Sequence, residues 1–242
     1  MPNTYFQFKN FIVHQEKGSL KVCTDACLFG AWVADKLKAA LPLHAQFLDI
    51  GTGTGLLSLM LMQELRSSVD AIEIDADAYA QATDNFINSP WAQNVSAYHA
   101  DIRQYKPDHS YDLIIANPPF YENDLRSADD QKNKAKHETT LDLQTLAGLA
   151  AGWLKPGGYF ALLLPAHRGK QAIEVCAASG MHLRDFTNVR QSERHSAFRV
   201  MMIFSTGDVN SNQVNMQEIT IKEHGVYSPD FVQLLKPFYL HL

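Results

Sequence analysis

Long apolar runs and paired cysteines are both scarce in this sequence. The most apolar windows, such as residues 56–62, are far shorter than the roughly 18 residues that a membrane-spanning helix needs. The opening residues MPNTYFQFKN contain no apolar stretch of the kind found in secretion signals. The three cysteines, Cys23, Cys27 and Cys176, have no CxxC spacing, which argues against a disulfide framework or a zinc site. We therefore expect a soluble, cytoplasmic protein with buried thiols, no membrane partner and no metal.

A large excess of charge of one sign is also absent. The 242 residues include 21 Lys plus Arg and 26 Asp plus Glu, which gives a net charge of −5. This mildly acidic balance argues against nonspecific coating of nucleic acid, although a local basic face can still bind a phosphate backbone. Hydrophobic residues make up 46% of the chain, enough for a full core, and no repeats or low-complexity runs occur. We predict a single domain over residues 1–242, acting as a monomer.

Short strand-like segments alternate with helix-like segments over most of the chain, a pattern typical of an α/β fold. The last two strand-like segments have no helix between them, which indicates an antiparallel hairpin at the end of the sheet. We predict a doubly wound, mostly parallel sheet of seven strands. The predicted strands are 46–50, 69–74, 95–99, 111–116, 158–164, 183–189 and 199–205, and the predicted helices are 56–65, 76–86, 143–154 and 169–179.

Residues 1–44 precede this core and contain two local signals. Short apolar segments separated by a Lys-Gly-Ser turn predict a small hairpin. Asp25 is predicted to cap the helix that follows the hairpin. The hairpin segments are 5–8, 11–13 and 20–22, and the turn is 17–19.

Residues 207–242 are predicted to form a C-terminal extension packed on the core of residues 45–206. The stretch 206–216 is rich in Asn, Ser and Gly, which predicts a turn or loop. Ser228 and Pro229 then have the residue types of an N-cap and a first helical position. We therefore expect a short final helix that docks on the core.

A glycine-rich turn follows the first strand of the predicted core, with Gly51, Gly53 and Gly55 directly after the Asp49-Ile pair. Glycines there let the backbone approach a ligand closely, and the next helix directs free N–H groups toward it. A dinucleotide-binding fingerprint would place its third glycine one residue later, at Leu56, so the sequence gives only weak support for NAD binding.

Acidic residues end three consecutive predicted strands, at Asp49, Glu73 and Asp101. Glu73 lies 22 residues after Gly51, the spacing expected of an acid that accepts hydrogen bonds from both ribose hydroxyls. Three such carboxylates suit a ligand with an amine, a ribose diol and an adenine amino group. S-adenosylmethionine has all three groups, so we predict it as the cofactor.

The fourth strand ends in a corner formed by Asn117, Pro118, Pro119 and Phe120. The prolines prevent regular strand pairing and hold the Pro118 carbonyl away from the ladder. The Asn117 side-chain oxygen and this carbonyl can accept both hydrogens of an exocyclic amino group on a base, which aims its lone pair. Phe120 offers a stacking face for the base. We predict these four residues as catalytic, while an isolated Asn-Pro pair would read as an ordinary turn.

These motifs resemble those of class I S-adenosylmethionine-dependent methyltransferases that modify exocyclic amino groups. A narrower resemblance, over nearly the whole chain, is to the bacterial tRNA(Val) adenine-37 N(6)-methyltransferase family. Two features depart from that family: cysteines stand at Cys23 and Cys27, and Lys136 replaces an expected arginine, which loses a bidentate phosphate contact. The narrower resemblance rests on residues 21–25, 30–32, 136–138 and 154–158.

The resemblance implies a methyltransferase in which the segment 24–25 lies over the cofactor. It also implies that Glu73 holds the ribose and that Asp101 with Ile102 frames the adenine. The reaction would be methyl transfer to the 6-amino group of an adenine in the tRNA anticodon loop. Together, motif and resemblance predict cofactor contacts at Thr24, Asp25, Asp49, Gly51, Gly53, Gly55, Glu73, Ile74, Asp101, Ile102 and Asn117.

Other substrates remain open at this point. The Asn-Pro-Pro-Phe corner also suits methylation of a guanine amino group in ribosomal RNA. Methylation of a glutamine amide in a protein is a further option, although such enzymes usually have Tyr at the position of Phe120 and a larger domain before the glycine turn. A catalytically idle module that binds S-adenosylmethionine or RNA is the alternative from another class.

A long segment of mixed charge, residues 121–141, follows the corner. Long loops in compact domains are often functional lids, although a merely solvated loop is an equally good interpretation here. Basic residues after the fifth strand and around the last hairpin, including Arg190 and Arg199, should project from the same edge and form a basic rim. The predicted substrate-binding residues are Tyr121, Arg126, Lys132, Lys134, Lys136, His137 and Arg168.

Overall fold

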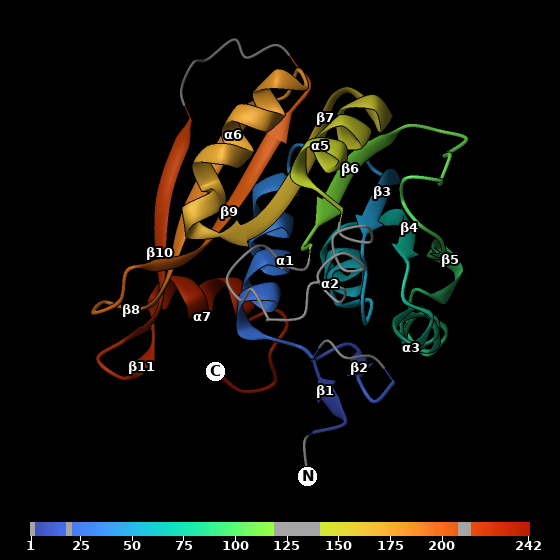
Figure 1. Ribbon diagram of the computed structural model, residues 1–242. Helices are drawn as coiled ribbons and strands as arrows, with labels where there is room; N and C mark the ends of the chain where they lie inside the picture. The colour runs from blue at the N-terminus through green and yellow to red at the C-terminus, as the bar shows by residue number, and fades with distance from the viewer. Residues whose placement is uncertain (1–2, 18–20, 119–140, 208–213) are drawn as a thin grey trace, which may run out of the picture.

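The computed structural model describes residues 3–17, 21–118, 141–207 and 214–242 of the chain. Nine strands in this part of the chain form one sheet in the order β11-β10-β8-β9-β7-β6-β3-β4-β5 (Figure 1). The strands are β3 (Ala45–Ile50), β4 (Ser67–Glu73), β5 (Val95–His99), β6 (Tyr111–Ala116), β7 (Leu154–Pro165), β8 (His182–Ser192), β9 (Ala197–Ser205), β10 (Asn215–Glu223) and β11 (Val226–Tyr227).

The pairing confirms the doubly wound, mostly parallel α/β sheet. Strands β5, β4, β3, β6 and β7 are parallel neighbours, and β9 runs antiparallel between β7 and β8. The predicted number of seven strands was wrong, because β10 pairs in parallel with β8 and β11 pairs with β10. The predicted loop at 206–216 therefore ended too late, since β10 already begins at Asn215.

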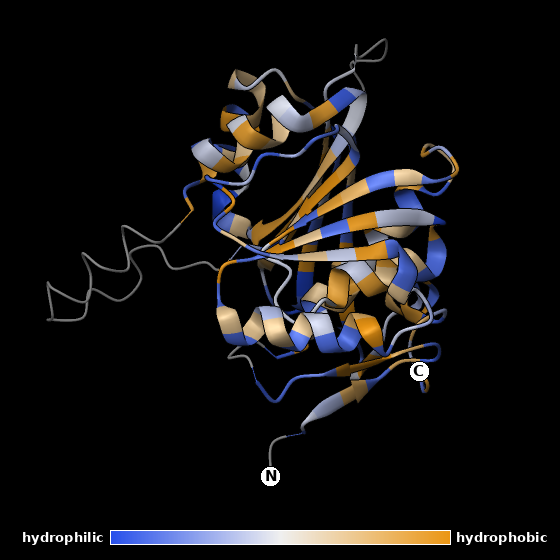
Figure 2. Cartoon of the chain, turned by 90° about the vertical axis from the view of Figure 1, so that its right-hand side faces the viewer, coloured by the Kyte–Doolittle hydropathy of each residue, from blue (hydrophilic) through white to orange (hydrophobic). Residues whose placement is uncertain are grey.

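Helices cover both faces of the sheet. On one face, α1, α2, α3 and α7 share a hydrophobic core with Leu113 and Ile115 of β6, whereas α5 and α6 share a core with Ile114 and Ala116 on the other. A strand buried on both faces has apolar residues at successive positions, as in Leu113 to Ala116 of β6, all of which are buried. Figure 2 shows orange, hydrophobic stretches along the strands in the interior of the molecule, next to bluer, hydrophilic stretches. The helices are α1 (Thr24–Leu37), α2 (Leu56–Glu64), α3 (Ala76–Ile87), α5 (Leu143–Trp153), α6 (Gly169–Ala178) and α7 (Pro229–Leu235).

The N-terminal hairpin exists, but its turn was misplaced by the sequence analysis. Strand β1 (Tyr5–Gln7) pairs antiparallel with β2 (Ile12–His14), and the chain reverses between them, where the Phe8 N–H donates to the Phe11 carbonyl at 2.9 Å. The predicted turn at 17–19 lies largely outside the described residues, and the described part of the predicted return segment, 21–22, is not a strand.

The two helix-cap predictions had different outcomes. Asp25 is not the N-cap of α1, because that helix begins at Thr24 and Cys23 occupies the cap position without a side-chain hydrogen bond. Ser228 does cap α7, accepting the Phe231 N–H at 3.2 Å, with Pro229 at the first helical position. None of the helices in the described ranges is long and apolar enough to cross a membrane.

Candidate active site

The order of the parallel strands reverses between β3 and β6. In the register of this pair, Ile50 lies beside Ala116, so the loops that begin at Gly51 and Asn117 leave the sheet side by side. Ligands of open α/β sheets bind at such a switch point, beyond the carboxyl ends of the strands. The glycine turn and the Asn-Pro corner, 66 residues apart in the chain, thus meet at one edge.

The glycine loop, residues 51–55, has a conformation that favours glycine at three positions. Gly51, Gly53 and Gly55 have φ angles of 71°, 59° and 82°, respectively. A Cβ atom on Gly55 would lie 2.5 Å from Cε1 of Phe86, whereas one on Gly51 would meet nothing within 4 Å. Gly55 is thus required for packing, while the space beside Gly51 is open to a ligand.

Asp49, at the end of β3, is completely buried. Its Oδ2 accepts hydrogen bonds from the hydroxyls of Thr52 and Ser58, both at 2.7 Å. Its Oδ1 has no hydrogen-bond partner among the described residues. Burial raises the pKa of this carboxyl to about 6, against the two hydroxyl contacts that lower it.

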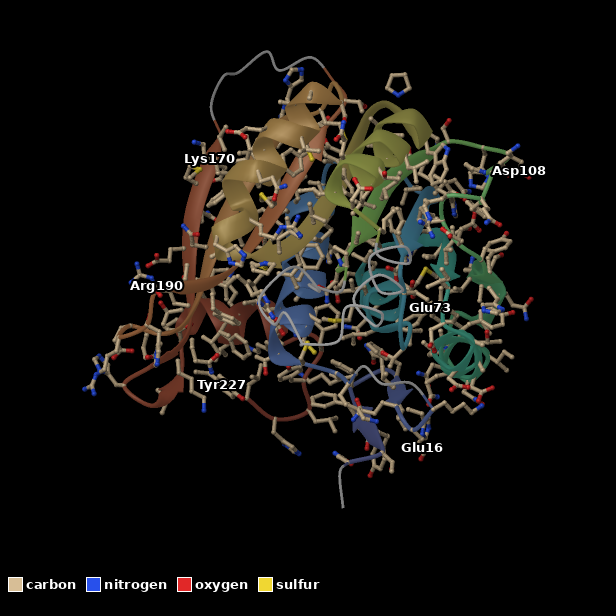
Figure 3. All side chains as sticks on the ribbon, viewed as in Figure 1. Glu16, Glu73, Asp108, Lys170, Arg190 and Tyr227 are labelled. Atoms are coloured by element: carbon tan, nitrogen blue, oxygen red, sulfur yellow. The ribbon has the colours of Figure 1, made fainter. Side chains whose placement is uncertain are left out.

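Glu73 ends β4 and holds the glycine loop directly (Figure 3). The Gly53 N–H donates to its Oε2 at 2.9 Å, and the N–H groups of Ile74 and Asp75 donate to Oε1 at 2.9 and 3.0 Å. A carboxylate can accept about four hydrogen bonds, so Oε2 retains capacity for a further donor. The predicted role toward ribose remains a prediction.

The predicted adenine end of the site contains one exposed apolar side chain and one ion pair. Ile74 is 52% exposed, while Ile102 is buried. The single Nε–H of Arg103 is shared between the two carboxylate oxygens of Asp101, each at 3.0 Å, and this contact lowers the pKa of Asp101. Because the Asp101 carboxylate is already paired with Arg103, an adenine amino group would have to share that carboxylate with Arg103.

The N-terminus of α1 reaches the same edge of the sheet. Asp25 accepts a hydrogen bond from Arg199 Nε at 2.8 Å, and Arg199 lies opposite Pro165 at the carboxyl end of β7. This pair explains why Asp25 does not act as a helix cap. Thr24, the preceding residue, is exposed there.

Asn117 and Pro118 are half-buried at the edge of the sheet, directly after β6. The other predicted catalytic residues, Pro119 and Phe120, lie outside the described residues. So do most of the predicted substrate-binding residues: Tyr121, Arg126, Lys132, Lys134, Lys136 and His137.

The remaining basic residues do reach this edge, but acidic residues neutralise several of them. Arg190 pairs with Glu218 at 2.8 Å, and Arg199 pairs with Asp25. Arg168, the last substrate candidate, donates to Gln171 at 3.3 Å. The predicted basic rim is therefore weaker in charge than its composition suggested.

Three features of the site fit S-adenosylmethionine. The buried Asp49 oxygen lacks a partner, the space beside Gly51 is open, and the exposed Ile74 adjoins Glu73. Among the described residues, no group of three or more His, Cys, Asp or Glu side chains could hold a metal ion. No role was predicted for Thr52, Ser58 or Arg103, and Arg199 was predicted only as part of the basic rim, because the contacts of these side chains arise only in the folded arrangement.

Comparison with known proteins identifies the family. The methyltransferase small domain model matches residues 20–202. A tRNA1(Val) (adenine(37)-N6)-methyltransferase of Dyadobacter fermentans is 40% identical, with 98% of both chains covered. The chain belongs to the tRNA1(Val) (adenine(37)-N6)-methyltransferase family. A Citrobacter koseri protein of the same description is 37% identical over 98% of this chain and 95% of its own.

Solved structures agree on the fold. A predicted O-methyltransferase from Agrobacterium tumefaciens superposes with a TM-score of 0.63 over 88% of this chain and 96% of its own, at 16% identity. A methyltransferase from Pyrococcus furiosus gives 0.54 over 81% and 88%, at 21% identity. At this level of identity, the likeness supports the methyltransferase-type sheet alone.

Proposed function

We propose that this protein transfers a methyl group from S-adenosylmethionine to the 6-amino group of adenine 37 in valine tRNA. Full-length membership of the family supports the substrate. The structural observation that carries the proposal is the register of β3 and β6, which sets Asn117 beside the glycine loop. An acceptor for an amino group and a loop suited to a nucleoside-containing cofactor thus share one edge.

S-adenosylmethionine, when bound, supplies an electrophilic methyl group. The residues expected to hold it are Asp49, through its unpartnered oxygen, and Glu73, through its remaining acceptor capacity. Ile74 offers an apolar surface for the adenine, and the open space beside Gly51 allows close approach of the cofactor to the backbone.

Asn117 and Pro118 act on the substrate in this proposal. The amino nitrogen of adenine is a poor nucleophile, because its lone pair is delocalised into the ring. Accepting both N–H groups on the Asn117 side-chain oxygen and the Pro118 carbonyl draws the nitrogen toward tetrahedral geometry and orients the lone pair. An anticodon-loop nucleotide is already partly unpaired, so presenting its base costs at most a few kcal/mol.

The names of the full-length relatives favour tRNA adenine over the alternatives of guanine in ribosomal RNA or a glutamine amide. We further propose that the protein acts as a cytoplasmic monomer, because one chain supplies the whole edge and tRNA is the substrate. The organisation as one domain, with 1–44 over the cofactor and 207–242 packed on the core, is part of the same proposal.

Methylation of bulk RNA from a strain lacking the protein tests this function. Purified protein and labelled S-adenosylmethionine should give N(6)-methyladenosine at position 37 of valine tRNA, identified by mass spectrometry of the isolated tRNA. Label in guanosine, in ribosomal RNA or in protein would contradict the proposal. No transfer to any acceptor would point to the idle binding module.

Two variants of Asn117 separate its roles. Asn117→Ala should lower the single-turnover rate by orders of magnitude, since correct orientation contributes several kcal/mol to lowering a barrier. Asn117→Asp keeps an acceptor oxygen in place and should retain more activity. Equal residual rates of the two variants, at saturating cofactor and RNA, would refute the acceptor role.

A further inference from the structure

Three buried amide side chains fasten the N-terminal segment to the rest of the molecule. Gln15, Gln81 and Asn85 are 6%, 2% and 1% exposed, respectively. Each of them forms hydrogen bonds with backbone groups. Buried amides need partners for their donors and acceptors, so these contacts hold residues 12–17 against α3 and bond residues 21–22 to them. We call these described residues, 12–17 and 21–22, the N-terminal strap.

Asn85 differs from the other two, because its side chain joins the N-terminal strap to the glycine loop. Its Oδ1 accepts the His14 N–H at 2.9 Å. Its Nδ2 donates to the His14 carbonyl at 2.9 Å and to the Thr54 carbonyl at 2.8 Å. The amide thus uses both hydrogens and its oxygen, and it bridges segments that are 40 residues apart in the sequence.

The contact with Thr54 completes the support of the glycine loop. The Gly53 N–H is already bonded to Glu73, and the ring of Phe86 fills the space beside Gly55. Asn85 therefore holds the peptide between these two fixed points. Because Asn85 and Phe86 are neighbours on α3, that helix supports the loop at both Thr54 and Gly55.

The N-terminal strap leads on to the predicted cofactor contacts of α1. Gln15 accepts the Val22 N–H on its Oε1 at 2.7 Å, and the Lys21 ammonium donates to the Gln15 carbonyl. Val22 is two residues before Thr24, where α1 begins. Strand β2, which ends at His14, lies beside α3 (Figure 1). One side chain thus connects both segments that border the predicted cofactor site.

We infer that Asn85 is a positioning residue for cofactor binding, which acts by fixing the Thr54 carbonyl and the N-terminal strap relative to each other. The inference rests on the proposed function, since it assigns the cofactor to the glycine loop. Asn85 does not contact the cofactor in this account. Its contribution is to hold the loop in the bound geometry before the ligand arrives, which lowers the ordering cost of binding.

Gln81 provides a matched control on the same helix. Its Oε1 accepts the N–H groups of Glu16 and Lys17 at 2.9 and 3.0 Å. Gln81 therefore holds the strap, but in the described part of the chain it forms no hydrogen bond with the glycine loop. Loss of Gln81 should therefore loosen the strap alone. Loss of Asn85 should loosen both segments.

The test compares Asn85→Asp, Asn85→Ala and Gln81→Ala in the full chain. Asn85→Asp keeps an acceptor for His14 but removes both donors and sets a carboxylate against the Thr54 carbonyl. Hydrogen exchange of the Gly53 and Gly55 amides in ligand-free protein should accelerate in both Asn85 variants and stay unchanged in Gln81→Ala. S-adenosylmethionine affinity, measured by calorimetry, should fall at least about fivefold for the Asn85 variants and less than about twofold for Gln81→Ala.

A separation of binding from chemistry completes the test. The single-turnover rate at saturating S-adenosylmethionine should return to within about twofold of wild type in the Asn85 variants, since the residue acts on binding. Wild-type exchange and affinity in a folded Asn85→Asp or Asn85→Ala variant would overturn the inference, as would an equal loss in Gln81→Ala. Failure of the proposed cofactor assignment is distinct, because the wild-type protein itself would then bind no S-adenosylmethionine. A different methyl acceptor would leave the comparison of affinities intact.

Discussion

Replacing Glu73 with glutamine tests whether one carboxylate supports both the glycine loop and the cofactor. Alanine would leave three N–H groups without their acceptor, whereas glutamine keeps one oxygen for Ile74 and Asp75. Its amide nitrogen would face the Gly53 N–H, so one charge-assisted hydrogen bond of 2.9 Å is lost. Such bonds contribute about 1.5–3 kcal/mol, and we expect the free energy of unfolding in urea to fall by about that amount.

The same change should weaken cofactor binding. If the ribose hydroxyls donate to Glu73, loss of its charge removes at least about 1.4 kcal/mol of binding free energy, which corresponds to about a tenfold higher Kd by calorimetry. Ser228→Ala is the matched control, because loss of this distant helix cap costs about 1 kcal/mol of stability without touching the loop. Wild-type affinity in a folded Glu73→Gln protein would refute the ribose assignment.

Three further predictions concern the loop and the RNA. Because burial raises the pKa of Asp49 to about 6 in the folded protein, the folded state binds this proton more tightly than the unfolded chain. The resulting stabilisation is complete below about pH 4 and is lost as pH rises through about 6, so Asp49→Asn should flatten the urea-unfolding profile over that range. Gly55→Ala should lower the thermal midpoint more than Gly51→Ala, since only the former adds a clash with Phe86 to the cost of a positive φ. Similar midpoints would contradict the packing argument. Simultaneous replacement of Lys132, Lys134 and Lys136 by alanine should weaken tRNA binding and flatten its salt dependence, with unchanged cofactor affinity. An unchanged salt slope would mean that the RNA binds elsewhere.

The sequence predicted the centre of the sheet well and its C-terminal edge poorly. Strands β3 and β6 are mostly apolar, because they are buried on both faces, and their predicted bounds differ by at most one residue. Strand β10 follows a stretch of polar sequence and buries only Ile219 and Ile221. Three apolar residues in nine, Met216 included, are a weak signal, so pairing with β8, and not local preference, makes this segment a strand.

The same distinction applies to the site. Glycine spacing and the acids after strands are local signals, and they located the loop and the corner at one edge. Asp25 was assigned as a cap because its residue type suits one, but Arg199, 174 residues away, supplies a stronger partner. Asn85 was missed, since an amide on a helix has no pattern that reveals a loop carbonyl as its partner.

The two ends of the chain together determine where α1 lies, and thereby where Thr24 and Asp25 meet the sheet. The N–H of Lys9 donates to the Phe238 carbonyl at 2.8 Å, and Phe8 forms a bridge with Tyr239. Helix α7 packs along α1 and fully buries its Phe231 side chain in the same core. The start of α1 is bonded to β9 through the ion pair of Asp25 with Arg199, and the rest of the helix packs on α7. The orientation of α1 is therefore fixed both at its start and along its length. The described part of the C-terminal segment thus supports the edge of the sheet at which we propose that the cofactor binds.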